Sequence, residues 1–259
     1  MDHIKQLRIY PPEDGKCDLI VIYEVKEPEP ISLNGHYLSV DLGIHNLMTC
    51  YDSAGTSFIL GRKYLEISRK YDKEIARLGH QWNSCQSAGG IKYPKPSKHM
   101  LKVYKKKRNC IHDYLHKVTR AVVDYCKAND IHTVIIGDIT NIRRNKNLGK
   151  VTNQKLHALP YAKIYGMLEY KLAMHGITLV KQTEEYSSQC SPHAPQVTKE
   201  YAKKCNRTNR GLYKDQMSVY NADAVGAYNI MRKYFAGCGK EKKISVTGLS
   251  SPLIIKVAV

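Results

Sequence analysis

The pattern of hydrophobic and polar positions along the chain changes between two periods, and each period predicts a type of element. Short apolar runs bounded by turn residues predict strands at 19–25, 37–43, 46–51, 56–60, 131–136 and 177–184. Apolar residues that recur every three or four positions predict helices at 63–85, 100–129, 160–175 and 222–234. The order is three antiparallel strands, helices, a strand, a helix, a strand, an insert and a last helix, which is typical of a mixed α/β sheet flanked by helices.

Three segments lack such a period. Pro28 and Pro30 interrupt the first apolar run and predict a linker near 26–36. The segment 191–220 contains proline and many basic residues, so we expect an irregular insert before the last helix. The tail beyond Phe235 is rich in Gly and Ser, and we expect it to be peripheral.

Composition narrows the class of protein. The 259 residues are 42% hydrophobic and 8% aromatic, which is sufficient for a globular core and excludes wholesale disorder. No apolar run approaches the roughly 18–20 residues that span a bilayer. Eight cysteines are scattered without an export signal, which favours the reducing cytoplasm over a disulfide framework. The formal charge of +18 predicts an anionic partner, and nucleic acid is the commonest large one.

The basic residues are concentrated in 92–150, which holds fifteen Lys and Arg against four Asp. A solvated helix face would explain a charge run by itself, but such a face usually carries acidic partners four residues away. Their scarcity favours a phosphate-binding surface. The nucleic-acid contacts that we expect, here and in the insert, are Lys105, Lys106, Lys107, Arg108, Lys117, Arg143, Arg144, Lys203, Lys204, Arg207 and Arg210.

Acidic residues stand at the ends of two predicted strands and at the start of the last helix. Asp41 closes the strand at 37–43, Glu184 and Glu185 close the last strand, and Asp223 follows Asn221, a predicted N-cap. Carboxylates placed in this way can hold two Mg²⁺ ions, which prefer oxygen ligands and activate a water against a phosphodiester. Acids at strand ends are common in α/β proteins, so the pattern is weak by itself.

Local motifs make it more specific. Val-Asp-Leu-Gly-Ile-His-Asn-Leu at 40–47, His-Lys at 116–117 with Val-Ile-Ile-Gly-Asp-Ile at 134–139, Glu-Tyr-Ser-Ser-Gln-Cys-Ser at 185–191 and Asn-Ala-Asp-Ala-Val-Gly-Ala-Tyr-Asn-Ile at 221–230 occur in series. In this order they resemble the motifs of the TnpB family, the OrfB-type transposon-encoded RNA-guided nucleases related to type V CRISPR effectors. The resemblance covers roughly residues 1–235.

This resemblance implies an RNase H-like (RuvC) fold and Mg²⁺-dependent cleavage of a DNA target under the direction of a guide RNA from the transposon end. It assigns Asp41, Glu184 and Asp223 as catalytic residues that hold the Mg²⁺ ions. Many members carry the second acid at the position of Gly137, and others carry it just before the Tyr-Thr-Ser segment. Because strand side chains alternate, only one of Glu184 and Glu185 can face the site, and we favour Glu184.

The resemblance also predicts a zinc ribbon in the insert, but the sequence departs from it. Cys190 and His193 could form one half-site, whereas the other half offers only Cys205, with Thr208 in the place of a fourth ligand. Structural zinc takes four N or S ligands. We therefore expect a zinc-free insert that contacts nucleic acid through basic residues.

Compared with complete family members, the chain corresponds to a C-terminal portion. The expected parts are the end of a wedge-like β region at 1–30, the first part of the nuclease domain at 36–189, a target-binding insert at 190–220, the final nuclease helix at 221–235 and a tail at 236–259. We expect a protein of the cytoplasm, associated with the nucleoid and not with membranes. Two hypotheses remain open: an RNA-guided DNA endonuclease, and an inactive nucleic-acid-binding remnant or regulator of the same family.

Overall fold

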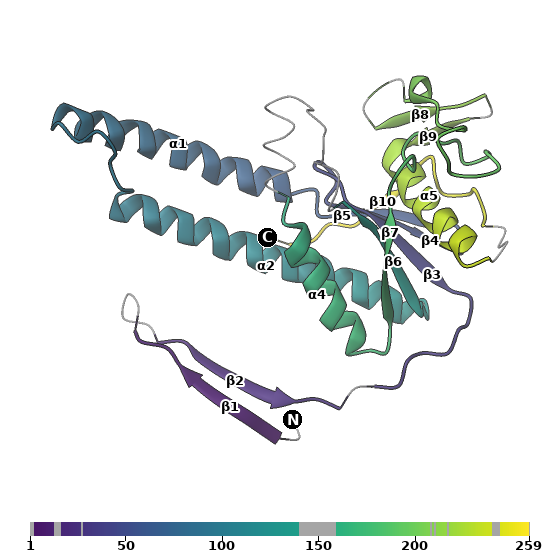
Figure 1. The fold of residues 1–259 in the computed structure, drawn as a ribbon, viewed down its shortest axis with the longest axis horizontal. Helices are drawn as coiled ribbons and strands as arrows, with labels where there is room; N and C mark the ends of the chain where they lie inside the picture. Colours follow the sequence, from purple (N-terminus) through teal and green to yellow (C-terminus); the bar gives the residue numbers. More distant parts are fainter. Residues whose placement is uncertain are drawn as a thin grey trace.

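A six-stranded mixed sheet forms the centre of the molecule in the computed structural model (Figure 1). The structure describes residues 3–12, 17–26, 28–139, 159–207, 209, 211–216, 218–239 and 244–258. The strands are β3 Tyr37–Asp41, β4 Met48–Asp52, β5 Ser57–Leu60, β6 Thr133–Asp138, β7 Thr178–Thr183 and β10 Leu253–Ile254. Their order is β10-β5-β4-β3-β6-β7. β4 runs antiparallel to its neighbours β3 and β5, and β3, β6 and β7 run parallel. The predicted mixed α/β class is confirmed.

Helices cover both faces of this sheet. They are α1 Tyr64–Ala88, α2 Lys98–Ala128, α4 Tyr161–Ala173 and α5 Ala222–Gly237. Val134 and Ile136 pack into the core with α2 and α4, whereas Ile135 between them packs with α5. Because side chains alternate along a strand, the continuous apolar run of β6 supplies both cores. Figure 1 shows α1 and α2 extending beyond the sheet as a long antiparallel pair.

Two caps determine where the helices begin. The Ser97 hydroxyl accepts a hydrogen bond from the Met100 amide at 3.2 Å, and α2 begins at the following Lys98. The Asn221 side chain accepts bonds from the amides of Asp223 and Ala224, both at 3.1 Å, as predicted. Such caps satisfy amides that have no partner within the helix. The cap at Asn221 fixes the first turn of α5 and therefore the backbone position of Asp223.

The end of β6 differs from the prediction. The strand was predicted to end at residue 136, but β6 continues to Asp138 because it pairs with β7 to its end, Gly137 with Gln182 and Asp138 with Thr183. β7 in turn ends at Thr183, so Glu184 lies in the turn after the strand and not on it. The two strands therefore end at the same level of the sheet.

The insert and the tail are also more ordered than predicted. The insert contains a 3-10 turn, η1 Lys204–Asn206, and an antiparallel hairpin of β8 Leu212–Lys214 and β9 Val219–Asn221. In the tail, β10 pairs with β5, Leu249 is buried, and the buried Tyr51 donates its hydroxyl to the carbonyl of Ser245. The expectation of a peripheral tail is wrong for this part, because it extends the sheet and covers its edge.

A separate hairpin precedes the sheet (Figure 1). Its strands are β1 His3–Ile9 and β2 Leu19–Glu24, of which only β2 was predicted. The pairing register places six apolar side chains on one face, and all are exposed: Ile4, Leu7, Ile9, Leu19, Val21 and Tyr23. None of the helices in the described ranges combines the length and the apolar character that crossing a membrane requires.

Candidate functional site

The three predicted acids lie at one edge of the sheet. Asp41 is the last residue of β3, and Glu184 follows the last residue of β7, two strands away. β3, β6 and β7 are parallel, so their carboxyl ends meet at this edge. Asp223 lies in the first turn of α5, the helix that packs against the sheet beside Ile135. Positions that are 39 and 143 residues apart along the chain are therefore brought to a common region.

Asp41 lies under α5, where the helix approaches the sheet closely. A Cβ atom at Gly226 would collide with Oδ2 of Asp41, so a larger residue there would displace this carboxylate. Burial raises the pKa of Asp41 to about 7, and the negative charge of Asp223 adds to the effect, whereas Arg207 opposes it. The close packing of α5 thus leaves Asp41 as a buried carboxyl group that lacks a full positive counter-charge.

Glu184 occupies the space above Gly137. A Cβ atom at that glycine would collide with the Glu184 carboxylate, whose Oε1 is buried and has no hydrogen-bond partner among the described residues. Burial raises the pKa of Glu184 to about 9, and the nearby charges of Asp41 and Asp138 raise it further, although Lys233 lowers it. An ionised carboxylate oxygen that is buried without a partner is costly, and either protonation or a bound cation relieves the cost.

The alternative acid, Glu185, is placed differently. It is exposed, and its backbone carbonyl accepts a hydrogen bond from Nζ of Lys233 at 3.0 Å. The two residues therefore point to different environments, but alternation along a strand is not the reason, because both lie beyond the end of β7. Asp138, the last residue of β6, accepts a hydrogen bond from the Tyr161 hydroxyl at 3.4 Å.

Asp223 is held by two side chains from other parts of the chain. Asn46 donates from Nδ2 to Oδ2 at 2.8 Å, and Arg207 donates from a terminal guanidinium nitrogen to Oδ1 at 3.3 Å. Sequence analysis placed Arg207 among the nucleic-acid contacts and assigned no role to Asn46. Asn46 could have been noticed, because it is the polar residue of the loop that follows Asp41. Nothing in the sequence indicates that Arg207 reaches back from the insert.

The donor set fits a hard divalent cation. It offers carboxylate oxygens from three segments, and Oε1 of Glu184 has no hydrogen-bond partner among the described residues. Asp41 and Glu184 have raised pKa values, and a bound cation would favour their deprotonated forms. Within the described residues, however, no three His, Cys, Asp or Glu side chains lie close enough together to form a ready-made metal cluster. Asp223 is turned toward Asn46 and Arg207 instead.

The candidate zinc ligands do not form a metal-binding group among the described residues. Cys190 is buried and its Sγ donates to the Thr198 carbonyl at 3.3 Å. His193 pairs its Nε2 with the Tyr220 hydroxyl at 2.9 Å, and Cys205 is exposed. Thr208 lies outside the described residues. The described part of the insert is joined to α5 by hydrogen bonds to the side chains of Asn229 and Arg232.

The predicted nucleic-acid contacts fall into three groups. On α2, Lys106 and Arg108 are exposed, whereas Lys107 pairs with Asp72 at 2.5 Å and Lys117 with Asp113 at 2.8 Å. In the insert, Lys203 and Lys204 are exposed beside Arg207. Lys105, which also lies on α2, is half-buried. The third group, Arg143, Arg144 and Arg210, lies outside the described residues.

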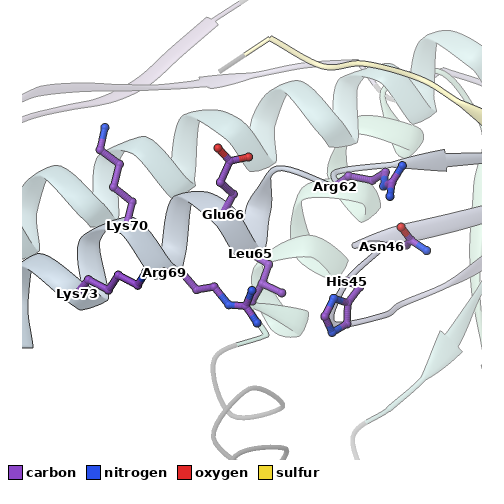
Figure 2. A pocket seen from close by; sticks show the side chains of 8 residues that line it. All are labelled: His45, Asn46, Arg62, Leu65, Glu66, Arg69, Lys70 and Lys73. Atoms are coloured by element: carbon purple, nitrogen blue, oxygen red, sulfur yellow. The ribbon is translucent and has the colours of Figure 1, made fainter. Parts of the chain in front are cut away.

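A cavity of about 640 Å³ adjoins this region (Figure 2). Its walls are the β3–β4 loop and the first turns of α1, and its lining residues are His45, Asn46, Arg62, Leu65, Glu66, Arg69, Lys70 and Lys73. Asn46 lines the cavity and also binds Asp223, so the cavity and the carboxylate region share a wall. Sequence analysis assigned none of the α1 residues to a site.

Two family models match the chain in series. The OrfB_IS605 model, described as "Probable transposase", matches residues 20–143, and the model "Cas12f1-like, TNB domain" matches residues 161–230. The chain is also 24% identical over 238 residues to "Putative RNA-guided DNA endonuclease InsQ" of Escherichia coli (strain K12). The match covers 87% of this chain and 56% of InsQ, so the chain spans about half the length of that curated relative.

Two solved structures share the fold. The Cas12f1 chain of a Cas12f1-sgRNA-target DNA complex aligns with a TM-score of 0.56 at 16% identity, over 82% of this chain and 52% of that one. A CRISPR-Cas12f ternary complex aligns with a TM-score of 0.55 at 14% identity, over 86% and 44% of the two chains. At these identities the likeness concerns the fold, and it agrees with the RNase H-like sheet flanked by helices.

Proposed function

We propose that this chain, which belongs to the TnpB family, carries the nuclease centre of an RNA-guided, Mg²⁺-dependent DNA endonuclease of transposon origin. The observation that carries the proposal is the meeting of Asp41, Glu184 and Asp223 at one edge of the sheet, with Oε1 of Glu184 buried and without a partner among the described residues. Such a group is unfavourable without a cation and favourable with one.

The chain's own residues have distinct tasks in this centre. Asp41 and Glu184 give up their protons when they take a cation, so their raised pKa values make cation binding depend on pH. Mg²⁺, when bound, supplies activation of a water and neutralisation of charge on the scissile phosphate. Asn46 keeps Asp223 oriented through its 2.8 Å hydrogen bond. Arg207, paired with Asp223 at 3.3 Å, is placed to bind a phosphate once Asp223 turns to the cation.

The proposed partners are a DNA target and a guide RNA. Support comes from the printed name of InsQ, from the sgRNA and target DNA in the Cas12f1 complex, and from the formal charge of +18. In guided nucleases base pairing reads the sequence, and the protein holds the backbone through basic residues. A DNA target places the activity at the nucleoid, in the cytoplasm. We assign these backbone contacts to the exposed basic residues of α2 and of the insert.

A second function, nucleic-acid binding without cleavage, is favoured by the contacts of Asp223. Arg207 pairs with Asp223, and no three acids among the described residues form a ready-made cluster, which is compatible with a chain that binds nucleic acid without cutting it. The glycine at 137 no longer favours this alternative, because the Glu184 carboxylate occupies the space above it. The two functions differ in a single measurable property, the Mg²⁺-dependent release of product.

The test is cleavage of end-labelled DNA with Mg²⁺, with and without co-purified RNA. We expect Asp41→Asn and Glu184→Gln to reduce product release by at least about 100-fold, because each removes an anionic ligand. Glu185→Gln is the matched control and retains activity, since that side chain is exposed. Equal product from wild type and Asp41→Asn refutes the proposal. Salt-sensitive binding without cleavage selects the alternative.

A further inference from the structure

The cavity in Figure 2 lies between the β3–β4 loop and the first three turns of α1. We propose that this cavity and the basic face of α1 beyond it bind the phosphodiester backbone of single-stranded DNA and direct it to the carboxylates. The proposal rests on the proposed function and adds a binding site to it. Arg62, Arg69 and Lys73 are the residues that would contact phosphates.

The charges of the lining support an anionic ligand. Four lining side chains are cationic and only Glu66 is anionic, a surplus of three positive charges. None of the four cations has an ion-pair or hydrogen-bond partner among the described residues. On α2, by contrast, Lys107, Lys117 and Arg120 each pair with an aspartate. Cations that the protein leaves unpaired break no ion pair when they bind a phosphate, so α1 is better suited than those α2 positions.

The cations are arranged along a line. Arg69 and Lys73 are four residues apart in α1, which places them on one side of the helix about 6 Å apart along its axis. Arg62 lies in the turn just before the helix begins. In Figure 2, the Arg69 side chain points toward His45, whereas Glu66 and Lys70 point to the opposite side. A strand can therefore follow the helix and contact one cation after another.

This line ends at the carboxylates. Asn46 forms part of the cavity wall, and its Nδ2 binds Asp223 at 2.8 Å. A strand that leaves the α1 face through the cavity thus arrives beside Asp223, the residue that Arg207 approaches from the insert. Leu65 and His45 supply the less polar part of the lining, on which a base or sugar can pack.

The size of the cavity favours a single strand. A volume of about 640 Å³ corresponds to a cube about 9 Å on a side. A B-form duplex does not enter such a space, since its major groove alone is about 12 Å wide. Individual nucleotides of an unpaired strand can enter it. Double-stranded DNA should therefore lose little affinity when the α1 cations are removed.

The test measures binding without cleavage. Fluorescence anisotropy of a labelled single-stranded DNA is recorded in EDTA over a range of salt concentrations, for wild type and for Arg69→Gln/Lys73→Gln. The matched control, Lys26→Gln/Lys256→Gln, removes two exposed cations that belong neither to the cavity lining nor to α2 or the insert. Circular dichroism checks that both double variants are folded. A second arm replaces the probe by the same sequence as a duplex, and a third by single-stranded RNA.

We expect the α1 variant to bind single-stranded DNA several-fold more weakly, with a slope of log affinity against log salt that is smaller by about 1.4, or about 0.7 for each lost phosphate contact. The control should keep the wild-type slope. Equal slopes for the two variants, or an equal loss on duplex DNA, overturn the proposal. A larger loss on RNA than on DNA overturns the assignment to DNA. Because cleavage is not measured, a chain that binds in this way and never cuts refutes only the proposed function.

Discussion

Gly137 and Glu184 share one space at the ends of neighbouring strands. β6 and β7 end at the same level, and the missing side chain at 137 leaves room for the carboxylate that follows β7. A larger residue at 137 would therefore displace Glu184. The glycine, which in the sequence suggests the loss of an acid, is in the structure the condition for a different acid to reach the same region.

This relation predicts the effect of a single methyl group. In Gly137→Ala the new Cβ collides with the Glu184 carboxylate and must move it, so we expect a fall in Mg²⁺-dependent cleavage of at least about tenfold, because small displacements of catalytic groups are costly. Gly166→Ala is the control, since nothing in the described structure lies within 4 Å of its Cβ position and alanine favours a helix. If both variants cleave equally well, Glu184 is not positioned by Gly137.

At the scale of elements, α5 links the carboxylates. Its Asn229 is fully buried and donates from Nδ2 to the carbonyls of Ser187 at 2.7 Å and of Cys190 at 2.9 Å. The Ser187 hydroxyl in turn donates to the Glu184 carbonyl at 2.8 Å, and Tyr186 between them has a φ of 63°. Non-glycine residues adopt this conformation only when their surroundings impose it. Asn229 therefore holds the turn of Glu184 against the helix that carries Asp223.

Removal of this link should destabilise the protein. Asn229→Ala leaves two carbonyls without their donor in a buried place, and we expect a loss of at least about 2 kcal/mol in the free energy of unfolding measured with urea. Asn129→Ala removes a comparable bond, from Nδ2 to the Tyr125 carbonyl at 2.9 Å, but at the surface, so its cost should stay within about 0.5 kcal/mol. Similar midpoints for the two variants would contradict the role of Asn229.

The sequence correctly predicts elements whose pattern is local. Prediction from the sequence fails where contacts with distant segments determine the structure. The period of α2 and the apolar runs of β3 and β6 are local, and all three were predicted. β10 has two residues, and only its pairing with β5 makes it a strand. The same distinction applies to the site: motifs indicated Asp41 and Asp223, but the contact of Arg207 with Asp223 depends on how the insert folds back.

At the scale of the whole molecule, acidic and basic groups are separated. The buried acids gather at one edge of the sheet, while unpaired cations follow α1 away from that edge. Because these acids are buried away from the unpaired cations, their pKa values are raised, and the stability of the cation-free protein depends on pH. The folded pKa values of Asp41 and Glu184 are raised from 3.8 to about 7 and from 4.5 to about 9. The folded state then binds more protons than the unfolded state, so stability is fully present below about pH 4 and falls as the pH rises through 7 toward 9.

Mg²⁺ should oppose this fall. Binding to the folded state requires both groups to be deprotonated, so the cation stabilises more as the pH rises. We expect millimolar Mg²⁺ to raise the melting temperature by about 2–4 °C or more at pH 8.5, the shift that roughly 1 kcal/mol produces in a chain of this size, and by less at pH 6. Differential scanning fluorimetry with and without Mg²⁺, at constant ionic strength, measures both shifts.

The variant Asp41→Asn/Glu184→Gln separates this effect from general ionic stabilisation. Its neutral amides keep the shape of the two side chains but carry no proton that a cation could displace. Its melting temperature without Mg²⁺ should therefore change less between pH 6 and 8.5 than that of wild type, and Mg²⁺ should raise it at neither pH. A wild-type shift that is the same at both pH values, or one that persists in the double variant, would place the cation elsewhere on the protein.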